Sequence, residues 1–234
     1  DIEVERFISS TFALAIELLN QNDLSQGSIL IDIGFEKTSL GIFKNLALVH
    51  SFTFPIGKNH IVKDISKVCS LSTEETNALI QDLDFSFKNN NQFFDEKNCL
   101  KKTYFNNSNY RKISKTLLLD VVKARIDEIF EKIKKQIFLT GFNPSLGQKI
   151  FIFEAVSNLL NMDIYLSNFF GSEVEHLIKN QKIKNKNNTM EEFSSCLGAL
   201  KLIKNGWETE AIPEKVGVHS QNKGFFSKIF SKFS

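Results

Sequence analysis

The sequence of 234 residues contains little cysteine, proline and arginine. Its three cysteines, Cys69, Cys99 and Cys196, are odd in number and widely spaced, with no CxxC pair and no neighbouring histidine. This spacing argues against a disulfide framework and against a zinc site. Unpaired thiols of this kind are typical of a protein from a reducing cytoplasm.

Long apolar runs and strong net charge are also missing. No stretch approaches the roughly 18 uninterrupted apolar residues of a membrane-spanning helix, and the acidic start with Asp1, Glu3 and Glu5 does not resemble a secretory signal. The net charge is only +2, and three arginines stand among many lysines, so we expect no nucleic-acid partner. The chain opens on Asp1 and runs at once into a helical pattern, which suggests a piece of a longer protein.

The first quarter of the chain predicts one helix followed by three strands. Apolar residues recur at helical spacing over residues 3–20. Three short apolar runs follow at 28–33, 39–43 and 46–54, separated by short turn segments. Such short connections predict an antiparallel meander.

Helical patterns and loops alternate in the rest of the chain. The period becomes helical from Ile61, and a fresh helix start follows, with Ser72 or Thr73 as cap and Glu75 or Thr76 behind it.

Residues 84–110 are rich in Asn, Phe and Tyr and predict short exposed strands and long loops rather than a packed core. The longest helix pattern covers 114–138. We expect a buried strand at 149–153, a helix at 156–161 and another at 194–205.

The end of the chain is the most specific functional signal. A linker without periodicity, 208–222, precedes 223–234, where one apolar stripe is backed by cations. The stripe consists of Phe225, Phe226, Ile229, Phe230 and Phe233, and the cations are Lys223, Lys228 and Lys232. A short basic amphipathic helix after a polar linker predicts binding to an anionic membrane surface. The alternative is a helix that docks back on its own domain.

A second signal is the turn after the strand that ends at Asp32. Such a turn can bring backbone amides to a phosphate. Alternatively, Asp32 caps a hairpin turn in which Gly34 supplies positive φ. His60 is expected to cap a helix rather than act as a base. No catalytic triad, carboxylate pair or metal-ligand cluster stands out, so we predict neither catalytic residues nor a metal site.

In this order the elements resemble the C-terminal half of FtsA, the actin-like bacterial division family. The resemblance rests on five segments: 31–38, 42–50 and 55–64, the helix 124–130, and Gly198-Ala199-Leu200, with the terminal lysine and phenylalanine tail in addition. It implies an α/β fold: an actin-like (ribonuclease H-like) second lobe with a mixed sheet and flanking helices, an inserted α+β subdomain, and a C-terminal amphipathic helix.

The resemblance also implies a division of labour. Residues 1–57 and 136–207 would form the inner subdomain, and 58–135 would form the outer subdomain that docks the C-terminal tail of FtsZ. Four cations of the outer subdomain are candidates for that contact: Lys101, Lys102, Arg111 and Lys112. Self-association into filaments is implied as well.

The family's nucleotide site would fall on Asp32, Gly34, Thr38, Gly57, Arg125 and Glu128. Two features depart from the family pattern. Phe35 and Glu36 stand where the family has phosphate-loop glycines, and Glu154-Ala155-Val156 replaces its adenine-side turn. Because bulky side chains crowd a place where backbone must approach phosphate, we expect ATP to bind weakly or not at all.

The sequence therefore predicts a non-enzymatic membrane tether for FtsZ, peripheral on the cytoplasmic face of the cell membrane at the division septum. The alternative is an ATPase of the actin superfamily, such as a pilus-assembly actin homologue. The basic amphipathic terminus argues against the pilus version, and the missing glycines argue against catalysis.

Overall fold

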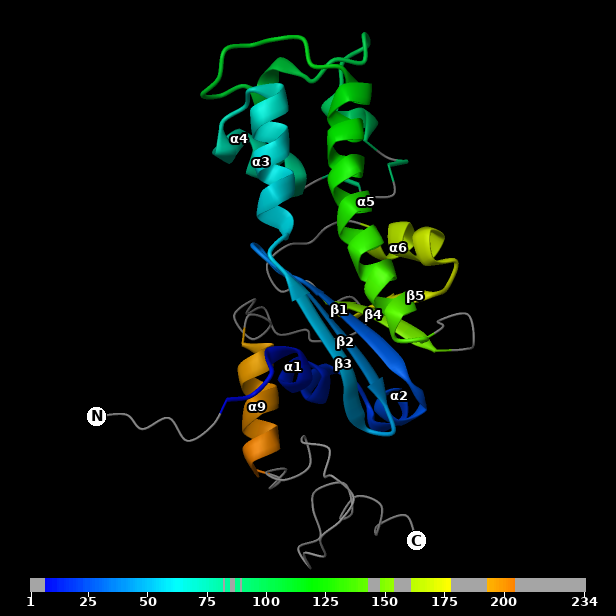
Figure 1. Cartoon of the computed structure of the whole chain (residues 1–234). Coiled ribbons are helices and arrows are strands. Elements are labelled where there is room, and N and C mark those ends of the chain that lie inside the picture. Colours follow the sequence, from blue (N-terminus) through cyan, green and yellow to red (C-terminus); the bar gives the residue numbers. More distant parts are fainter. Residues whose placement is uncertain are drawn as a thin grey trace, which may run out of the picture.

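The structure is a computed structural model, which describes residues 7–81, 83–84, 87–88, 90–142, 148–153, 161–177 and 193–204. A five-stranded mixed sheet, in the order β3-β2-β1-β4-β5, lies between two layers of helices. In Figure 1, α1 and α9 cover one face, α5 and α6 cover the other, and α3 and α4 extend beyond one end of the sheet. The expected α/β class with a mixed sheet and flanking helices is confirmed.

The first three strands form the predicted meander. β1 (Ser28–Ile33) pairs antiparallel with β2 (Thr38–Lys44), which pairs antiparallel with β3 (Ala47–Phe54). Asn45 and Leu46 both have positive φ, at 52° and 64°. A two-residue turn with positive φ at both positions matches the twist of a hairpin, so β3 begins one residue later than the sequence predicts.

The other two strands are parallel to β1. β4 (Lys149–Phe153) has the predicted bounds. It lies beside β1, with Asp32 opposite Phe153. β5 (Val174–His176) follows it at the edge, and its three residues are too few to leave an alternating pattern in the sequence. Along β1, Leu30 packs with the α1 and α9 side, and its neighbours Ile29 and Ile31 pack with the α3 and α5 side.

One face of the sheet is covered by two crossing helices. α1 (Ser10–Leu18) packs on α9 (Ser194–Lys204). A Cβ atom at Gly198 would lie 1.8 Å from the carbonyl oxygen of Ala13, so only glycine permits this crossing. The predicted helix covers 3–20, of which residues 3–6 lie outside the described part. α1 begins later than predicted, at Ser10, and ends earlier, at Leu18.

A separate short helix was not predicted. α2 (Gln21–Gln26) begins directly after α1 because Asn20 acts as its N-cap, with its Oδ1 accepting a hydrogen bond from the Asp23 N–H at 2.9 Å. Asn20 therefore starts a helix that the pattern over 3–20 does not contain.

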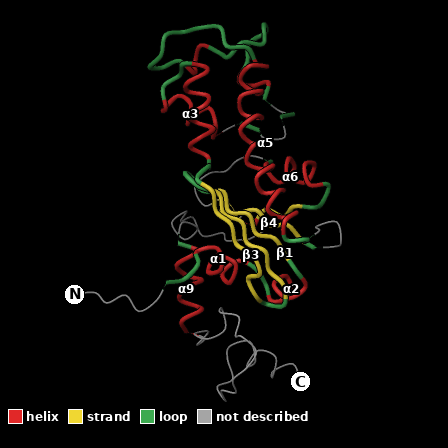
Figure 2. The backbone as a smooth tube through the Cα atoms, in the orientation of Figure 1, coloured by secondary structure: helices red, strands yellow, loops and turns green. Residues whose placement is uncertain are grey.

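The opposite face carries the longest helix. α5 (Lys115–Leu139) is capped by Ser114, has nearly the predicted bounds and buries one stripe of apolar side chains. Its buried residues are Leu118, Val122, Ile126, Ile129, Phe130, Ile133 and Ile137. α3 (Lys58–Cys69) runs beside it, as Figure 2 shows. α5 continues without a break past the expected subdomain boundary at residue 135.

Two further helices complete this side. α4 (Thr73–Gln81) begins with a capping box: the Ser72 N–H donates to the Glu75 carboxylate at 2.7 Å, and the Glu75 N–H donates to the Ser72 hydroxyl at 3.2 Å. Of the predicted alternatives, the cap is therefore Ser72 and its partner is Glu75. α6 (Met162–Phe170) was not predicted.

The prediction for residues 84–110 is wrong in one respect. This segment has little regular structure, with two short 3₁₀ helices, Asn91–Phe93 and Lys102–Tyr104. Nevertheless Phe93, Phe94 and Leu100 are buried in the main core, in one cluster with residues of α3 and α5. These residues belong to the core, whereas Tyr110 at the end of the segment is exposed.

Several predictions fall outside the described residues: most of the helix at 156–161, the linker 208–222 and the amphipathic segment 223–234. None of the helices that the structure describes is long and apolar enough to cross a membrane.

Candidate functional site

A row of polar side chains crosses three strands at the end of the sheet. Asp32 on β1 lies opposite Ser39 on β2, and Ser39 lies opposite Thr53 on β3. Directly opposite residues share a face of the sheet, and the Thr53 hydroxyl donates to the Ser39 hydroxyl at 3.1 Å. Sequence reasoning missed Thr53. The pairing of Ser39 with Thr53 depends on a register shift between Ile42 and Phe43, which the sequence does not indicate.

The carboxyl group of Asp32 is electrostatically unusual. Burial raises its pKa to about 6, and the nearby positive charge of Lys37 limits the rise. A buried acid that titrates close to neutral pH is costly to keep in a fold, which is typical of a functional position. The predicted residue Asp32 is therefore the centre of the candidate site.

The turn from Gly34 to Lys37 is seated on the N-terminus of α3. Within the turn, the Gly34 N–H donates to the Lys37 carbonyl at 2.9 Å. The Lys58 and Asn59 N–H groups of α3 then donate to the carbonyls of Gly34 and Phe35, at 3.0 and 2.8 Å. Two of the free N–H groups with which a helix begins are thus satisfied by the turn.

Two other predicted residues hold this contact together. The Thr38 hydroxyl donates to the Ile56 carbonyl at 2.7 Å, which joins the strand to the segment before α3. A Cβ atom at Gly57 would lie 2.5 Å from the Gly34 carbonyl oxygen and 2.7 Å from the Lys37 nitrogen. Gly57 is therefore required for close backbone approach. His60 caps this end as predicted, accepting the Gly57 N–H at its Nδ1 at 3.2 Å.

The interpretation of Gly34 as a positive-φ residue is wrong. Among the described glycines only Gly27, Gly141 and Gly171 have positive φ. Gly34 instead allows a tight approach, because a Cβ atom there would lie 3.0 Å from the Lys37 carbonyl oxygen.

Glu36 points its carboxylate at the same helix terminus. Its Oε1 accepts a hydrogen bond from the Asn59 side-chain amide at 2.5 Å, and its Oε2 lies 3.9 Å from the Lys63 amine. The turn that could hold a phosphate thus places the negative charge of Glu36, next to the positive charge of Lys37, at the start of α3, and α3 has given two of its first N–H groups to turn carbonyls. The residues present do not fit a bound phosphate group.

The remaining predicted nucleotide residues form an ion cluster between two helices. Arg125 on α5 donates from Nε and Nη2 to both oxygens of Asp64 on α3, at 2.6 and 3.1 Å. Its Nη1 donates to Glu128 at 2.5 Å. The hydrogen bonds with Asp64 are the main cause that raises the pKa of Arg125. Arg125, which also contacts Glu128 on its own helix, therefore joins α5 to α3 through Asp64. Asp64 was not among the predicted site residues.

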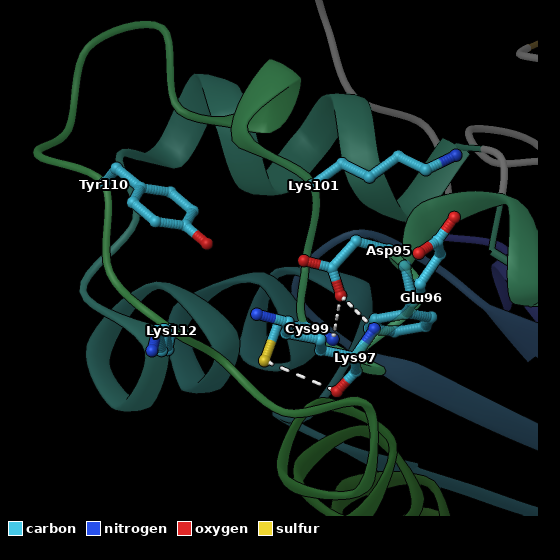
Figure 3. Close-up of a pocket in the computed structure, with 8 residues that line it drawn as sticks. Asp95, Glu96, Lys97, Cys99, Lys101, Tyr110 and Lys112 are labelled. Atoms are coloured by element: carbon cyan, nitrogen blue, oxygen red, sulfur yellow. Dashed lines mark hydrogen bonds between the residues drawn. The ribbon is translucent and has the colours of Figure 1, made fainter.

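The four predicted partner cations lie around the far end of the molecule. Lys101 and Lys112 line a pocket of about 860 Å³. The other lining residues are Phe94, Asp95, Glu96, Lys97, Cys99 and Tyr110. The lining thus comes from two wall segments, 94–101 and 110–112, and Figure 3 shows the Tyr110 ring directed toward the space between them. Lys102 lies in the second 3₁₀ helix, and Arg111 is exposed between two lining residues.

The remaining expectations concern a metal site, the membrane-binding segment and the adenine-side turn. In the described part of the chain, no group of three or more His, Cys, Asp and Glu side chains could hold a metal ion. The membrane candidates Phe225, Phe226, Ile229, Phe230 and Phe233, with Lys223, Lys228 and Lys232, lie outside the described residues, as does Glu154-Ala155-Val156.

Solved structures show the fold class. The chain is similar to MreB5 of Spiroplasma citri bound to AMPPNP, with a TM-score of 0.58 and 16% identity over 84% of this chain and 58% of that chain. It is equally similar to a PilM–PilN type IV pilus biogenesis complex, with a TM-score of 0.58 and 12% identity over 84% and 52% of the two chains. At these identities the likeness shows the actin-like fold alone, which confirms the expected architecture.

Curated relatives include FtsA proteins of several bacteria. The cell division protein FtsA of Agrobacterium fabrum is 23% identical over 164 residues, which are 69% of this chain and 36% of the relative. FtsA of Bacillus subtilis is 24% identical over 146 residues, 62% of this chain and 32% of the relative. The matched region spans about a third of the length of these relatives.

The family profile described as "Cell division protein FtsA" matches residues 29–198. This range begins at β1, includes the polar row, the turn on α3 and the α5 ion cluster, and ends at the glycine where α9 crosses α1. It covers well over half of the 234 residues, and the chain belongs to the FtsA family of cell division proteins.

Proposed function

We propose that this chain tethers FtsZ polymers to the cytoplasmic face of the cell membrane at the division septum. Residues 58–135 bind the C-terminal tail of FtsZ, and residues 223–234 bind anionic lipid. The observation that carries the proposal is the FtsA family match over 29–198 together with the basic amphipathic pattern that follows it in the same chain.

The chemistry of the pocket supports a peptide partner. Lys101 and Lys112 offer positive charge, and Phe94 and Tyr110 offer apolar surface beside it. A segment that alternates acidic and apolar residues satisfies both, and its association would be faster at low ionic strength. The exposed Arg111 and Lys102 add to the same positive end.

The terminal stripe supports a reversible membrane anchor. Fully burying five large apolar side chains would contribute roughly 8 to 15 kcal/mol, at about 1.5 to 3 kcal/mol each. Insertion into the headgroup region is partial, and ordering the helix costs entropy, so one copy binds weakly. Copies assembled in a filament bind firmly by avidity, which makes self-association part of the proposal.

We infer further that the chain is not an enzyme and binds ATP weakly or not at all. Asp32, Gly34, Thr38 and Gly57 keep the outline of a phosphate turn, but Glu36 and the seating of that turn on α3 oppose an anion. Arg125 is engaged with both Asp64 and Glu128. Calorimetry that finds micromolar affinity for ATP would contradict this part of the proposal. The pilus-type ATPase remains the alternative, supported only by a likeness of fold.

The partner proposal is tested by charge reversal with a matched control. Lys101→Glu and Lys112→Glu together invert the charge of the pocket lining. Lys44→Glu and Lys204→Glu make the same change of net charge at exposed positions away from it. We expect only the first pair to abolish binding of a synthetic FtsZ tail peptide in low salt. Equal binding by both double variants would show that this surface is the wrong one.

A further inference from the structure

Glu75 is a buried carboxylate that serves two parts of the chain at once. It lies near the start of α4 with only 4% of its surface exposed. One oxygen, Oε2, accepts from the Ser72 N–H at 2.7 Å and from the Ser108 hydroxyl at 2.5 Å. The other, Oε1, accepts from the Asn107 and Ser108 N–H groups at 2.7 and 2.9 Å.

Only one of the two oxygens takes part in the helix cap. A capping box requires only the exchange between Ser72 and Glu75, and this uses Oε2. Oε1 contributes nothing to that cap. Both of its hydrogen bonds go to backbone groups that are more than 30 residues away in sequence. A carboxylate here therefore does more than start a helix.

The hydrogen bonds also determine the charge of the group. Burial by itself raises the pKa of Glu75, but the donors of Ser108, Ser72 and Asn107 outweigh it and lower the pKa to about 2. The carboxylate is thus ionised at any physiological pH. Hydrogen bonds to an ionised acceptor are shorter and stronger than those between neutral groups.

The anchored segment is one wall of the pocket. Tyr110 and Lys112, both in the lining, follow Ser108 by two and four residues. In the opposite wall, Asp95 accepts the N–H groups of Lys97 and Cys99, each at 2.9 Å, as the dashed lines of Figure 3 show. The two walls meet beyond Lys112, where the Leu100 N–H donates to the Ile113 carbonyl at 2.8 Å. Glu75 therefore fixes the end of the 107–112 segment that lies away from this junction.

We propose that Glu75 is a positioning residue of the partner site: it holds residues 107–112 in place so that Tyr110 and Lys112 face the pocket. This inference rests on the proposed function, since it assigns a role within the surface proposed to bind an acidic, apolar peptide. Glu75 itself does not touch the peptide.

The test compares Glu75→Gln with Ser72→Ala. The glutamine side chain keeps one acceptor oxygen and replaces the other by an NH2 group, so it cannot accept the Ser72 N–H and the Asn107 and Ser108 N–H groups at the same time. It also loses the negative charge that strengthens these hydrogen bonds. Ser72→Ala weakens the same α4 cap but leaves the carboxylate and its bonds to Asn107 and Ser108 intact. Ser108→Ala removes the hydroxyl that donates to Glu75 and accepts the Ser72 N–H at 3.0 Å, but it keeps both N–H groups that bind Oε1, and gives a milder form of the first change.

Three measurements are made on the full chain: thermal melting, hydrogen exchange over residues 105–112, and affinity for the FtsZ tail peptide. We expect Glu75→Gln to weaken the peptide at least fivefold and to speed exchange at Asn107 and Ser108, and Ser108→Ala to act in the same direction more weakly. Ser72→Ala should lower the melting temperature comparably and change the affinity less than twofold. In the Glu75→Gln background, Lys112→Ala should have less effect on affinity than in the wild type.

Equal affinity losses in Glu75→Gln and Ser72→Ala, or unchanged exchange at Asn107 and Ser108, would overturn the inference. The proposed function itself is tested by the affinity of the wild-type chain for the peptide. If the wild-type chain binds no peptide, the partner proposal and the positioning role both fail, and faster exchange in Glu75→Gln then identifies Glu75 as a structural anchor only.

Discussion

The two ends of α3 are joined to their neighbouring segments by different means. At its N-terminus, the turn from Gly34 to Lys37 is held by backbone hydrogen bonds and by the missing side chain of Gly57. Beyond its C-terminus, the 107–112 segment is held by the side chain of Glu75. A backbone contact of the first kind cannot be released without disturbing the helix start. A side-chain contact of the second kind can be removed by one substitution while the core remains.

The largest effect is expected at the backbone contact. In Gly57→Ala the new Cβ atom meets three backbone atoms of the turn within 2.7 Å. Overpacking against atoms that cannot rotate away should cost roughly 3 kcal/mol or more of unfolding free energy, measured by denaturant titration. Gly41→Ala is the matched control. Its Cβ atom meets side-chain rather than backbone atoms, from Thr11 and Phe43, and a cost as large as that of Gly57→Ala would contradict the comparison.

The second largest effect is expected at Asp32, beside the turn from Gly34 to Lys37. Because the folded pKa of Asp32 is raised from 3.8 to about 6, its contribution to stability is fully present below pH 4 and is lost as pH rises through 6. Asp32→Asn removes this loss. We expect the variant to be more stable than the wild type by about 2 to 3 kcal/mol above pH 7, with the difference vanishing near pH 4. Melting curves across this range decide the matter, and a gain that does not change with pH would argue against a titrating Asp32.

The third prediction concerns the side-chain end. Asn90 is fully buried, and its amide group bridges the Asp84 backbone, accepting from the N–H and donating to the carbonyl, both at 2.8 Å. Asn90→Ala removes both bonds within the core and should cost about 2 kcal/mol. Hydrogen exchange should rise near residues 84–100 and stay unchanged at the turn on α3. Faster exchange at both ends would mean that they are not independent.

The smallest effect is expected between the two ends, at the ion cluster. Arg125→Lys keeps the charge but loses the two-pronged contact with Asp64. Because about a quarter to a third of the paired side chains is exposed to solvent, the loss should be only about 1 kcal/mol and should shrink in high salt. A loss that persists in molar salt would indicate a packing role for the guanidinium group.

The sequence predicts the backbone-built end better than the side-chain-built end. Short apolar runs and short turns locate β1 to β3 and the register of β1 with β2. The register shift between Ile42 and Phe43 then decides which residue of β3 lies opposite Ser39, and Thr53 was missed for that reason. At the other end, Ser72 and Glu75 are recognisable as a helix start, but nothing local indicates that the second oxygen of Glu75 serves Asn107 and Ser108. The burial of Phe93 was missed for the same reason, since it depends on long-range packing rather than on spacing along the chain.

Short elements were missed for a different reason. α2 has six residues and β5 has three, and neither is long enough to show a period. In α2 the deciding feature is the single hydrogen bond from the Asp23 N–H to Asn20, which a pattern of apolar residues does not contain.

The most direct test of the tether is a flotation experiment with three components: the chain, a labelled FtsZ tail peptide, and liposomes that contain anionic lipid. We predict that the peptide floats with the liposomes only when the chain is present. Deleting residues 223–234 should leave both peptide and chain at the bottom, and Lys101→Glu with Lys112→Glu should leave only the peptide there. A wild-type chain that does not float, or that floats without the peptide, would contradict the proposed function.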